Sequence, residues 1–443
     1  MALDILIGMA LVLGVIILVH EWGHFIVARL CGVRVDVFSI GFGPRLFGWK
    51  RGATDWRISA LPLGGYVRMA GQDLSDVDSN EVAPTGASDE LMSKPRWQRA
   101  LIAFGGPAVN FIFPLLLLGV FYAMVGLPHS ASLRQPLEIS YFSTSPAPSS
   151  PLHVGDRVVE INGVKNPTWE SALDLLDKLG PDAQVNLVVA DAGSEKNVQA
   201  TLKDGNAFNK LFGFAPFPPV IDEVAAGTPA KRAGLKSGDK IVEVNGKPVS
   251  YWGQFVDAVR QSNGQPVALK IARKSQQMAL SVTPIQHLSD TTENTWQIGV
   301  VNQDDVVYER TSLVASSEFA ARKTGDFFAQ TVGVVGKLFS GRASVKQLQS
   351  VVGIAQVSGE AVRRGPSQVI LLMAFISVNL GILNLLPIPI LDGGQILLLS
   401  IEGLMRRDLS MHVKERFVQV GLVFLLLLFA YVMYNDVVRL ISI

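Results

Sequence analysis

Four long apolar runs constrain this chain more than any other feature of its sequence. None contains a charged residue, and they cover Ile5–Val19, Leu101–Pro128, Val369–Leu391 and Phe417–Tyr434. A helix of about 20 apolar residues crosses a bilayer and satisfies its own backbone hydrogen bonds in hydrocarbon. We therefore expect a polytopic α-helical membrane protein with four transmembrane helices. The first run could instead be a signal peptide, but it lacks a basic n-region and leads into polar chemistry where a cleavage site would stand.

That polar chemistry is the motif His20-Glu21-Trp22-Gly23-His24. With about 3.6 residues per helical turn, His20 and His24 share one helix face, where two imidazoles can hold Zn²⁺ while Glu21 activates water as the catalytic base. Ionisable groups at membrane depth cost roughly 2.5 to 3.5 kcal/mol each, and a metal would compensate for this cost. A chance match is the alternative. A catalytic zinc site also requires a third protein ligand from another segment.

Asp392, directly after the third apolar run, supplies such a ligand. Pro387 and Pro389 precede it and interrupt regular helix, which is tolerated at membrane depth only where the backbone packs on protein or lines a cavity. We expect Asp392 to face the two histidines as the third zinc ligand. Asn379 and Asn384, in the same run, are candidate substrate-binding residues that could donate to a substrate carbonyl. Ordinary interhelical hydrogen bonds are the alternative role for both asparagines.

Residues 31–98 predict a membrane-associated β-hairpin region. Arg34–Phe38 and Trp56–Leu61 alternate as strands do, several glycines mark turns, and the acidic stretch Asp73–Asp89 predicts a mobile loop. The hairpin could simply lie on the membrane surface. Alternatively, an exposed edge could dip toward the zinc and hold the backbone of an unwound substrate, whose freed N–H and C=O groups need partners in hydrocarbon. Its candidate substrate-binding residues are Gly64, Gly65, Tyr66 and Val67.

The basic residues predict the orientation of the chain in an inner (cytoplasmic) membrane. Lys and Arg crowd the connection between the first and second runs and the connection between the third and fourth. Both connections are therefore expected to be cytoplasmic, which places the two termini and the segment 129–368 in the periplasm. The net charge of +1 and the lack of an aromatic-interleaved basic patch argue against nucleic-acid binding. A single cysteine, Cys31, excludes an internal disulfide.

The segment between the second and third runs contains a duplication. Ser145–Trp169 aligns with Thr228–Trp252, and each copy reads Gly-Asp, then alternating apolar residues, then Asn-Gly. This pattern predicts a strand followed by a hairpin turn, and two PDZ-like α+β domains whose grooves take peptide or protein termini by strand addition. Another small duplicated β domain is the alternative. The groove of the first copy is less well defined, because Ser150-Pro151-Leu152 replaces the Ala-Gly-Leu of the second copy.

Ser312–Leu338 has apolar residues at near-helical spacing. We expect an amphipathic helix on the periplasmic membrane surface, or one that packs on a PDZ-like domain.

The expected division of the chain is then 1–30, 99–128, 367–396 and 417–438 for the transmembrane helices, 31–98 for the β region, 129–212 and 213–290 for the PDZ-like domains, 291–366 for a periplasmic linker and 397–416 for a cytoplasmic loop.

Together these motifs resemble the bacterial site-2 proteases that carry tandem PDZ domains. The resemblance spans nearly the whole chain and rests on the His-Glu-x-x-His motif, Gly64 through Val67, Gly105 through Phe111, the duplicated units, and Asn384 through Gly394. It implies intramembrane cleavage of a single-pass anti-sigma factor in a stress response, clearance of remnant signal peptides, and a PDZ pair that filters substrates by size. Gln395 departs from the family, where close relatives often have histidine.

We therefore expect an intramembrane zinc metalloprotease that acts on single-pass membrane proteins in the lipid bilayer. A PDZ-based receptor or scaffold with a structural metal site is the alternative, and it predicts that Glu21→Gln leaves function intact. A transporter with a midplane metal site is a weaker alternative, because four spans without inverted symmetry give little indication of alternating access.

Overall fold

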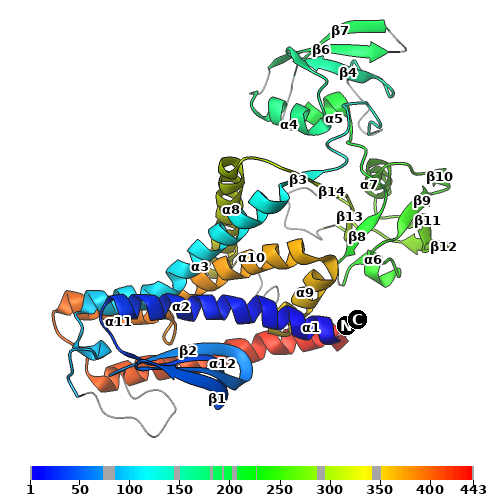
Figure 1. Ribbon diagram of the computed structural model, residues 1–443. Helices are drawn as coiled ribbons and strands as arrows, with labels where there is room; N and C mark the ends of the chain where they lie inside the picture. The colour runs from blue at the N-terminus through cyan, green and yellow to red at the C-terminus, as the bar shows by residue number, and fades with distance from the viewer. Residues whose placement is uncertain are drawn as a thin grey trace. The chain divides into compact units, whose positions relative to one another are not determined.

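The computed structural model describes residues 2–72, 85–143, 150–179, 183–191, 194–201, 207–225, 227–286, 295–341 and 351–441. Most of the expected acidic loop Asp73–Asp89 lies outside these residues. The chain divides into two units, which are described separately. Met1–Leu127 and Arg310–Ser442 form the first, and Pro128–Glu309 forms most of the second (Figure 1).

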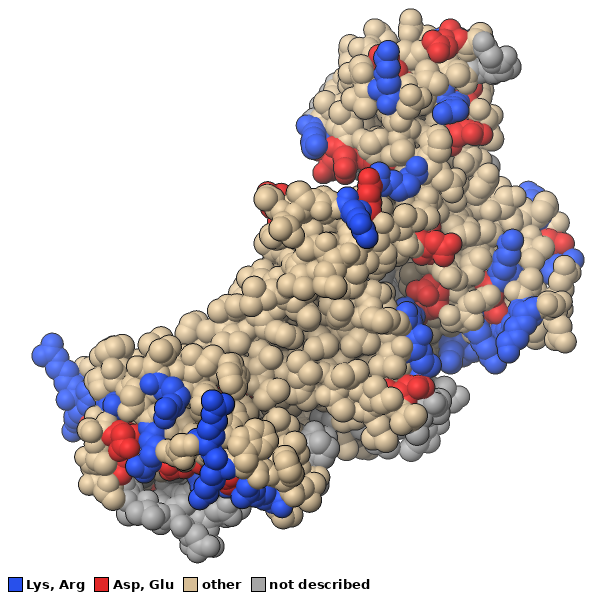
Figure 2. All heavy atoms as spheres, in the orientation of Figure 1, with Lys and Arg blue, Asp and Glu red and all other residues tan. Residues whose placement is uncertain are grey.

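The first unit contains four helical stretches that are long and apolar enough to cross a membrane: Leu3–Leu30, Arg96–Val125, Pro366–Asn384 and His412–Tyr434. The first stretch combines α1 (Ala2–Met9), a π-helical turn (Ala10–Gly14) and α2 (Val15–Leu30), and the others belong to α3 (Arg96–Val125), α10 (Pro366–Asn384) and α12 (Met411–Ile441). On the face shown in Figure 2, uncharged surface covers the middle of these helices, while Lys and Arg gather near α11 (Asp392–Met405) and the sheet of β1 (Val35–Arg51) and β2 (Thr54–Met69). Most of each apolar run is thus helical in the structure.

The third helical stretch is shorter than the expected segment 367–396. Helix α10 ends at Asn384, and a new helix, α11 (Asp392–Met405), begins after a non-helical connection. Pro387 and Pro389 explain the break, because proline lacks an N–H and disfavours helical geometry in the residue before it. Ile390, in the same connection, has a φ of 82°, a conformation that a β-branched residue rarely adopts. The break places Asp392 in the first turn of α11.

Strands β1 (Val35–Arg51) and β2 (Thr54–Met69) form a sheet that is more elaborate than the expected hairpin. Phe38 lies opposite both Trp56 and Val67, so the first half of β1 is flanked by β2 on both sides. The ribbon therefore doubles back on itself, helped by positive φ angles at Gly41 and Gly43. The last part of β2, from Gly65 to Met69, is left as an outer edge.

Aromatic side chains attach this sheet to α2. Trp22 and Phe25 of the helix meet Phe38 and Trp56 of the sheet, with ring centroids 5.1 to 5.9 Å apart. Such pairs contribute beyond their buried area, by about 0.5 to 1.5 kcal/mol each. The sheet is therefore held against the helix that carries the His-Glu-x-x-His motif.

The second unit repeats one architecture. One four-stranded sheet has the order β5-β4-β6-β7 and the other has the order β10-β9-β11-β12. The strands are β4 (Arg157–Ile161), β5 (Val164–Lys165), β6 (Gln184–Asp191), β7 (Ser194–Thr201), β9 (Lys240–Val244), β10 (Lys247–Pro248), β11 (Val267–Arg273) and β12 (Gln276–Val282), and the long helices are α4 (Trp169–Asp177) and α7 (Trp252–Gln261). Both Asn-Gly turns have positive φ at both residues, as the sequence predicts.

Each copy encloses its own apolar core, one around Trp169 and Phe212 and the other around Ile241 and Phe255. The second copy extends beyond the expected end at residue 290, because β13 (Val300–Asn302) pairs with β8 (Ile221–Val224). The short helices α5 (Ala207–Phe212) and α6 (Pro229–Arg232) complete the two copies. Strands β3 (Leu127–Ser130) and β14 (Val306–Glu309) pair where the chain enters and leaves this unit.

Helix α8 (Leu313–Phe339) occupies the segment expected to be amphipathic, and its buried apolar side chains pack on helices of the first unit. Ala320 and Phe327 of α8 share an apolar cluster with Leu118 of α3 and Val378 of α10. These buried side chains of α8 therefore cover α3 and α10 of the same unit, while Leu313 and Phe328 stay exposed. Helix α9 (Val351–Arg364) crosses α1 closely, since a Cβ on Gly359 would meet Ile5 at 2.7 Å.

Candidate active site

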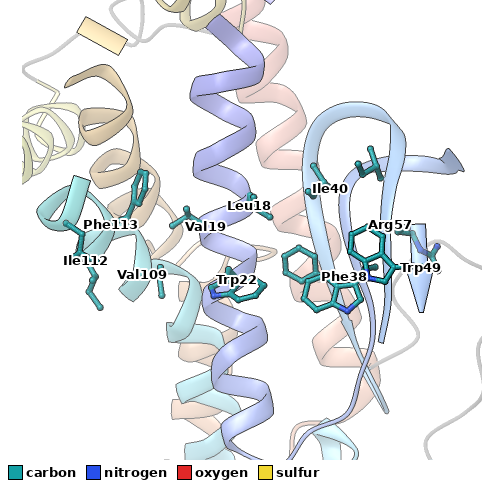
Figure 3. Close-up of a pocket in the computed structure, with 13 residues that line it drawn as sticks. Leu18, Val19, Trp22, Phe38, Ile40, Trp49, Arg57, Val109, Ile112 and Phe113 are labelled. Atoms are coloured by element: carbon teal, nitrogen blue, oxygen red, sulfur yellow. The ribbon is translucent and has the colours of Figure 1, made fainter. Parts of the chain in front are cut away.

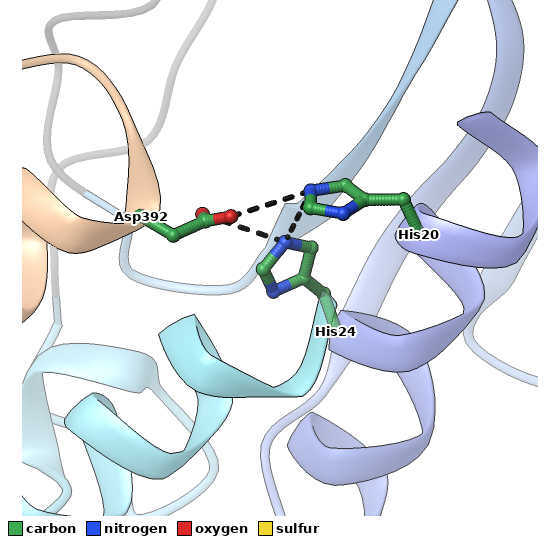
Figure 4. Close-up of side chains that lie close together, drawn as sticks. All are labelled: His20, His24 and Asp392. Atoms are coloured by element: carbon green, nitrogen blue, oxygen red, sulfur yellow. Dashed lines mark hydrogen bonds and ion pairs between the residues drawn. The ribbon is translucent and has the colours of Figure 1, made fainter. Parts of the chain in front are cut away.

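Three side chains from distant parts of the sequence meet at one point of the first unit (Figure 4). His20 and His24 project from one face of α2, with their Nε2 atoms 3.2 Å apart. Asp392 reaches them from the first turn of α11, with Oδ2 3.3 Å from Nε2 of His20 and Oδ1 3.5 Å from Nε2 of His24. The potential ligand atoms all lie within 4.8 Å of one another. The structure thus brings together the three residues that the sequence proposes as zinc ligands.

Glycines let the backbone of α3 approach this point. A Cβ on Gly23 of α2 would lie 2.3 Å from the carbonyl oxygen of Gly105, so the two helices cross at nearly van der Waals contact of their backbones. A Cβ on Gly106 would lie 2.3 Å from Nε2 of His24 and 2.7 Å from Cε1 of His20. The missing methyl group therefore leaves open the space that the two imidazole rings face.

The three residues fit a zinc ion. Two imidazole nitrogens and one carboxylate oxygen are a common protein ligand set for catalytic zinc, with the fourth position left open. Asp392 Oδ2 is buried and accepts no hydrogen bond from the described residues. A buried carboxylate oxygen without a donor is costly unless a cation compensates it. The backbone around the site also directs one ring, because Nδ1 of His24 lies 2.8 Å from the carbonyl oxygen of Ile102, which leaves Nε2 free to face the site.

Glu21 lies on α2 between the histidines and faces the sheet. Its carboxylate accepts a hydrogen bond from the backbone N–H of Val67. A Cβ on Gly65 would lie 3.3 Å from Cγ of Glu21, so the outer edge of β2 passes directly over this side chain. The N–H of Met69 is also directed away from β1 and donates to the side chain of Gln72. The residues expected to bind substrate backbone therefore form a strand edge beside Glu21.

The other two members of the expected strand, Gly64 and Tyr66, pack on Phe42. Gly64 has a φ of 147°, and a Cβ there would lie 2.1 Å from the Phe42 ring. The Tyr66 ring stacks on Phe42 with centroids 6.0 Å apart, and its hydroxyl lies 3.5 Å from Arg57. These contacts shape the start of the edge strand.

The two asparagines of α10 differ in position. Nδ2 of Asn384 lies 3.2 Å from Nε2 of His20, at the centre of the cluster. Asn379 does not join it: its Oδ1 accepts a hydrogen bond from Thr331 of α8 at 2.6 Å, and its Nδ2 donates to the Phe375 carbonyl. Asn379 thus makes the interhelical contact that was the alternative to substrate binding.

An apolar pocket lies beside the site. It has a volume of about 540 Å³ and is bounded by α2, α3 and the sheet, with Trp22, Phe38 and Val109 among its lining residues (Figure 3). Arg57 is the one charged side chain in the described lining. The pocket therefore suits apolar groups.

Comparison with known proteins agrees with this geometry. The family model of Peptidase family M50 matches residues 8–428. The chain belongs to peptidase family M50. Its relatives include the "Regulator of sigma-E protease RseP" of Salmonella typhimurium, 35 % identical over 97 % of each chain, and the protein of the same name in Escherichia coli, 34 % identical over 97 % of each chain. A Vibrio cholerae relative, 32 % identical over 98 % of each chain, carries a name that describes a zinc metalloprotease.

This M50 chain is a zinc metalloprotease of the membrane type, with helices long and apolar enough to span a bilayer. A solved PDZ domain of an SdrC-like protein from Listeria monocytogenes is also similar over 19 % of the chain and 84 % of its own length, at 19 % identity and a TM-score of 0.17.

The sequence reasoning did not assign a role to Asn110. This residue of α3 is fully buried, and its amide lies 3.0 Å from Nδ1 of His20. The signal that could have revealed it was present, because it is the one strongly polar side chain within the apolar run Leu101–Pro128.

Proposed function

We propose that this M50 protease cuts single-pass membrane proteins within the bilayer, with His20, His24 and Asp392 as zinc ligands and Glu21 as the catalytic base. One observation supports this proposal most directly. Glu21 lies between the proposed metal ligands and the outer edge of β2, where an extended peptide could be held. A structural metal site has no need of a carboxylate in this position.

The chain's own residues account for most of the proposed reaction. A bound zinc ion supplies a nucleophile from water at neutral pH and polarises a carbonyl group. Glu21 takes the proton from the attacking water and passes it to the nitrogen of the leaving amine as the C–N bond breaks. Asn384, whose Nδ2 points into the cluster, donates a hydrogen bond to the carbonyl oxygen as negative charge develops there.

The substrate must be unwound for this reaction, because a peptide bond inside a helix is shielded by its own hydrogen bonds. The edge from Gly65 to Met69 offers backbone partners that replace those bonds. Gly65 brings that backbone close to Glu21, and the adjacent apolar pocket accommodates apolar side chains of a transmembrane segment.

The names of the relatives suggest the biological substrate. By analogy with the regulators of sigma-E, the substrate is an anti-sigma factor that another protease has already shortened, and remnant signal peptides form a second class. The duplicated PDZ-like domains would exclude untrimmed substrates or bind new termini. The proposed location is the inner membrane, with both termini and the second unit periplasmic, as the distribution of Lys and Arg favours.

The test compares purified wild type with Glu21→Gln, measuring zinc content and cleavage of a model single-pass substrate in liposomes. We expect unchanged zinc and cleavage reduced about 10²- to 10⁴-fold, the usual contribution of a general base. Glu318→Gln, the same substitution on the exposed surface of α8, is the matched control. Full cleavage by Glu21→Gln would instead favour the receptor or scaffold alternative.

A further inference from the structure

The two proposed zinc-binding histidines depend on different partners for their orientation. Each presents Nε2 to the site, as the 3.2 Å distance between these atoms shows. A histidine that binds metal through Nε2 must carry its ring proton on Nδ1 and donate it to an acceptor. For His24 the acceptor is the backbone carbonyl of Ile102, 2.8 Å from Nδ1. The corresponding nitrogen of His20 faces the side chain of Asn110.

The amide of Asn110 is held firmly beside this ring. The side chain is fully buried, on a helix whose backbone is in close contact with α2 through Gly23 and Gly105. Ser377 of α10 donates a hydrogen bond to the main-chain oxygen of Asn110 at 2.9 Å and is itself fully buried. Three helices therefore fix the position of this amide. What can still change is whether Oδ1 or Nδ2 faces the His20 ring.

Which end faces His20 decides whether the ring can bind metal. In the structure Nδ2 of Asn110 lies 3.0 Å from Nδ1 of His20, and Oδ1 is buried without a hydrogen-bond partner among the described residues. If Nδ2 donates to Nδ1, the ring proton must sit on Nε2, and that nitrogen cannot bind a metal. Turning the amide by half a turn presents Oδ1 to Nδ1, which satisfies the buried oxygen and moves the ring proton to the side away from the metal.

We propose that Asn110 is a positioning residue whose Oδ1 accepts the Nδ1–H of His20 in the zinc-loaded protein and so holds His20 in its metal-binding tautomer. The proposal rests on the proposed role of His20 as a zinc ligand. It assigns to an uncharged residue of α3 the function that the Ile102 carbonyl performs for His24. Such partners of ligating histidines typically change metal affinity by about 10- to 100-fold when they are removed.

The test measures zinc dissociation constants by chelator competition on wild type, Asn110→Leu, Asn110→Asp and Ser377→Ala. Leucine has a similar shape and no acceptor, so zinc should bind about 10- to 100-fold more weakly. Aspartate keeps the acceptor and should bind zinc within a few-fold of wild type. Ser377→Ala removes a neighbouring hydrogen bond and leaves the Asn110 side chain in place, so its affinity should stay at the wild-type value.

Unfolding of the zinc-free variants, followed in parallel, separates metal binding from folding. Equal affinity of Asn110→Leu and wild type would overturn the proposal. In wild type, the ¹⁵N shifts of the His20 ring should show a protonated Nδ1 when zinc is bound. An unprotonated Nδ1 in the zinc-loaded protein would also overturn the proposal, whatever the affinities of the variants. A wild-type protein that binds no zinc would contradict the proposed zinc site, and the role of Asn110 would fall with it.

Discussion

Lys414, near the start of α12, reaches the carboxylate of Glu402 on α11, with Nζ 3.1 Å from Oε1. Glu402 is only 1 % exposed, and its other described partners are the guanidinium of Arg99 at 3.7 Å and the backbone N–H of Leu409. This buried ionic cluster joins the beginnings of α3 and α12 to α11. Removing Lys414 leaves the buried Glu402 carboxylate with Arg99, at 3.7 Å, as its remaining described cation, which compensates the charge only in part.

Lys414→Met should therefore destabilise the protein, by less than the roughly 3 to 5 kcal/mol of a fully broken buried pair, because Arg99 stays beside Glu402. Thermal unfolding in detergent checks this expectation. Arg416→Met, at an exposed position of the same helix, is the matched control and should have little effect. The double variant Glu402→Met with Lys414→Met should recover part of the loss, because the buried carboxylate is removed and Arg99 keeps Asp408 at 3.9 Å. Equal destabilisation by Lys414→Met and Arg416→Met would contradict the role of the cluster.

Gly106→Ala should abolish zinc binding, since the added methyl group would lie 2.3 Å from Nε2 of His24. Gly119→Ala provides the control on the same helix, because nothing lies within 4 Å of the Cβ it would add. A helical glycine-to-alanine change otherwise gains about 0.5 to 1 kcal/mol, so Gly119→Ala should be neutral or stabilising. Zinc content after gel filtration distinguishes the two variants. Full zinc in Gly106→Ala would show that the rings do not bind metal where the structure places them.

Val67→Pro should slow cleavage without loss of zinc. Proline removes the backbone N–H that donates a hydrogen bond to the Glu21 carboxylate. The sheet should tolerate it, because proline is accepted on a sheet edge where the N–H faces outward. Glu21 then loses a hydrogen bond that orients its carboxylate, which should lower kcat/KM roughly tenfold or more, the effect of about 1.4 kcal/mol. Val67→Ala shortens the side chain but keeps the N–H, and should behave like wild type. If both variants cleave at the wild-type rate, the Val67 N–H does not position Glu21 for catalysis.

Asp408, in the connection between α11 and α12, should make stability depend on acid pH. Its hydrogen bond to Arg96 lowers the pKa of the Asp408 carboxyl below its ordinary value of 3.8. A lowered folded-state pKa contributes stability above the unfolded-state value, and that contribution is lost as pH falls below about 3.8 through the folded-state value. Because Asp408 is largely exposed, the effect should stay below about 1 kcal/mol.

Unfolding midpoints of wild type and Asp408→Asn should accordingly differ slightly at pH 6 and converge at the most acid pH the protein tolerates. A difference that grows as the pH falls would contradict the assigned sign.

The metal cluster could be predicted from sequence because its signals are local. The spacing of His20 and His24 fixes a shared helix face, and a carboxylate at the end of another apolar run has few other partners. The helix break before Asp392 also followed from two prolines. Asn379 and Asn384 carried the same local signal, however, and only the three-dimensional structure separates them: one reaches His20, while the other is held by Thr331 of α8.

Packing partners were the part that the sequence could not predict. An amphipathic pattern predicts that α8 buries one face, but it does not identify the surface that this face contacts. In the structure, that surface belongs to α3 and α10. The doubled β1–β2 sheet was missed for a similar reason. Alternation identifies strands, whereas the second pairing of Phe38 depends on contacts far apart along the chain.

The π-helical turn at Ala10–Gly14 absorbs one extra residue between α1 and the helix that carries the histidines. In a regular α-helix each residue advances the helix by about 100°, so an uncompensated insertion would swing the imidazole-bearing face by more than a quarter of a turn. The wider winding of the π-helical turn takes up most of that rotation. The side chains of α1 therefore keep nearly the register with His20 and His24 that a regular helix one residue shorter would give them.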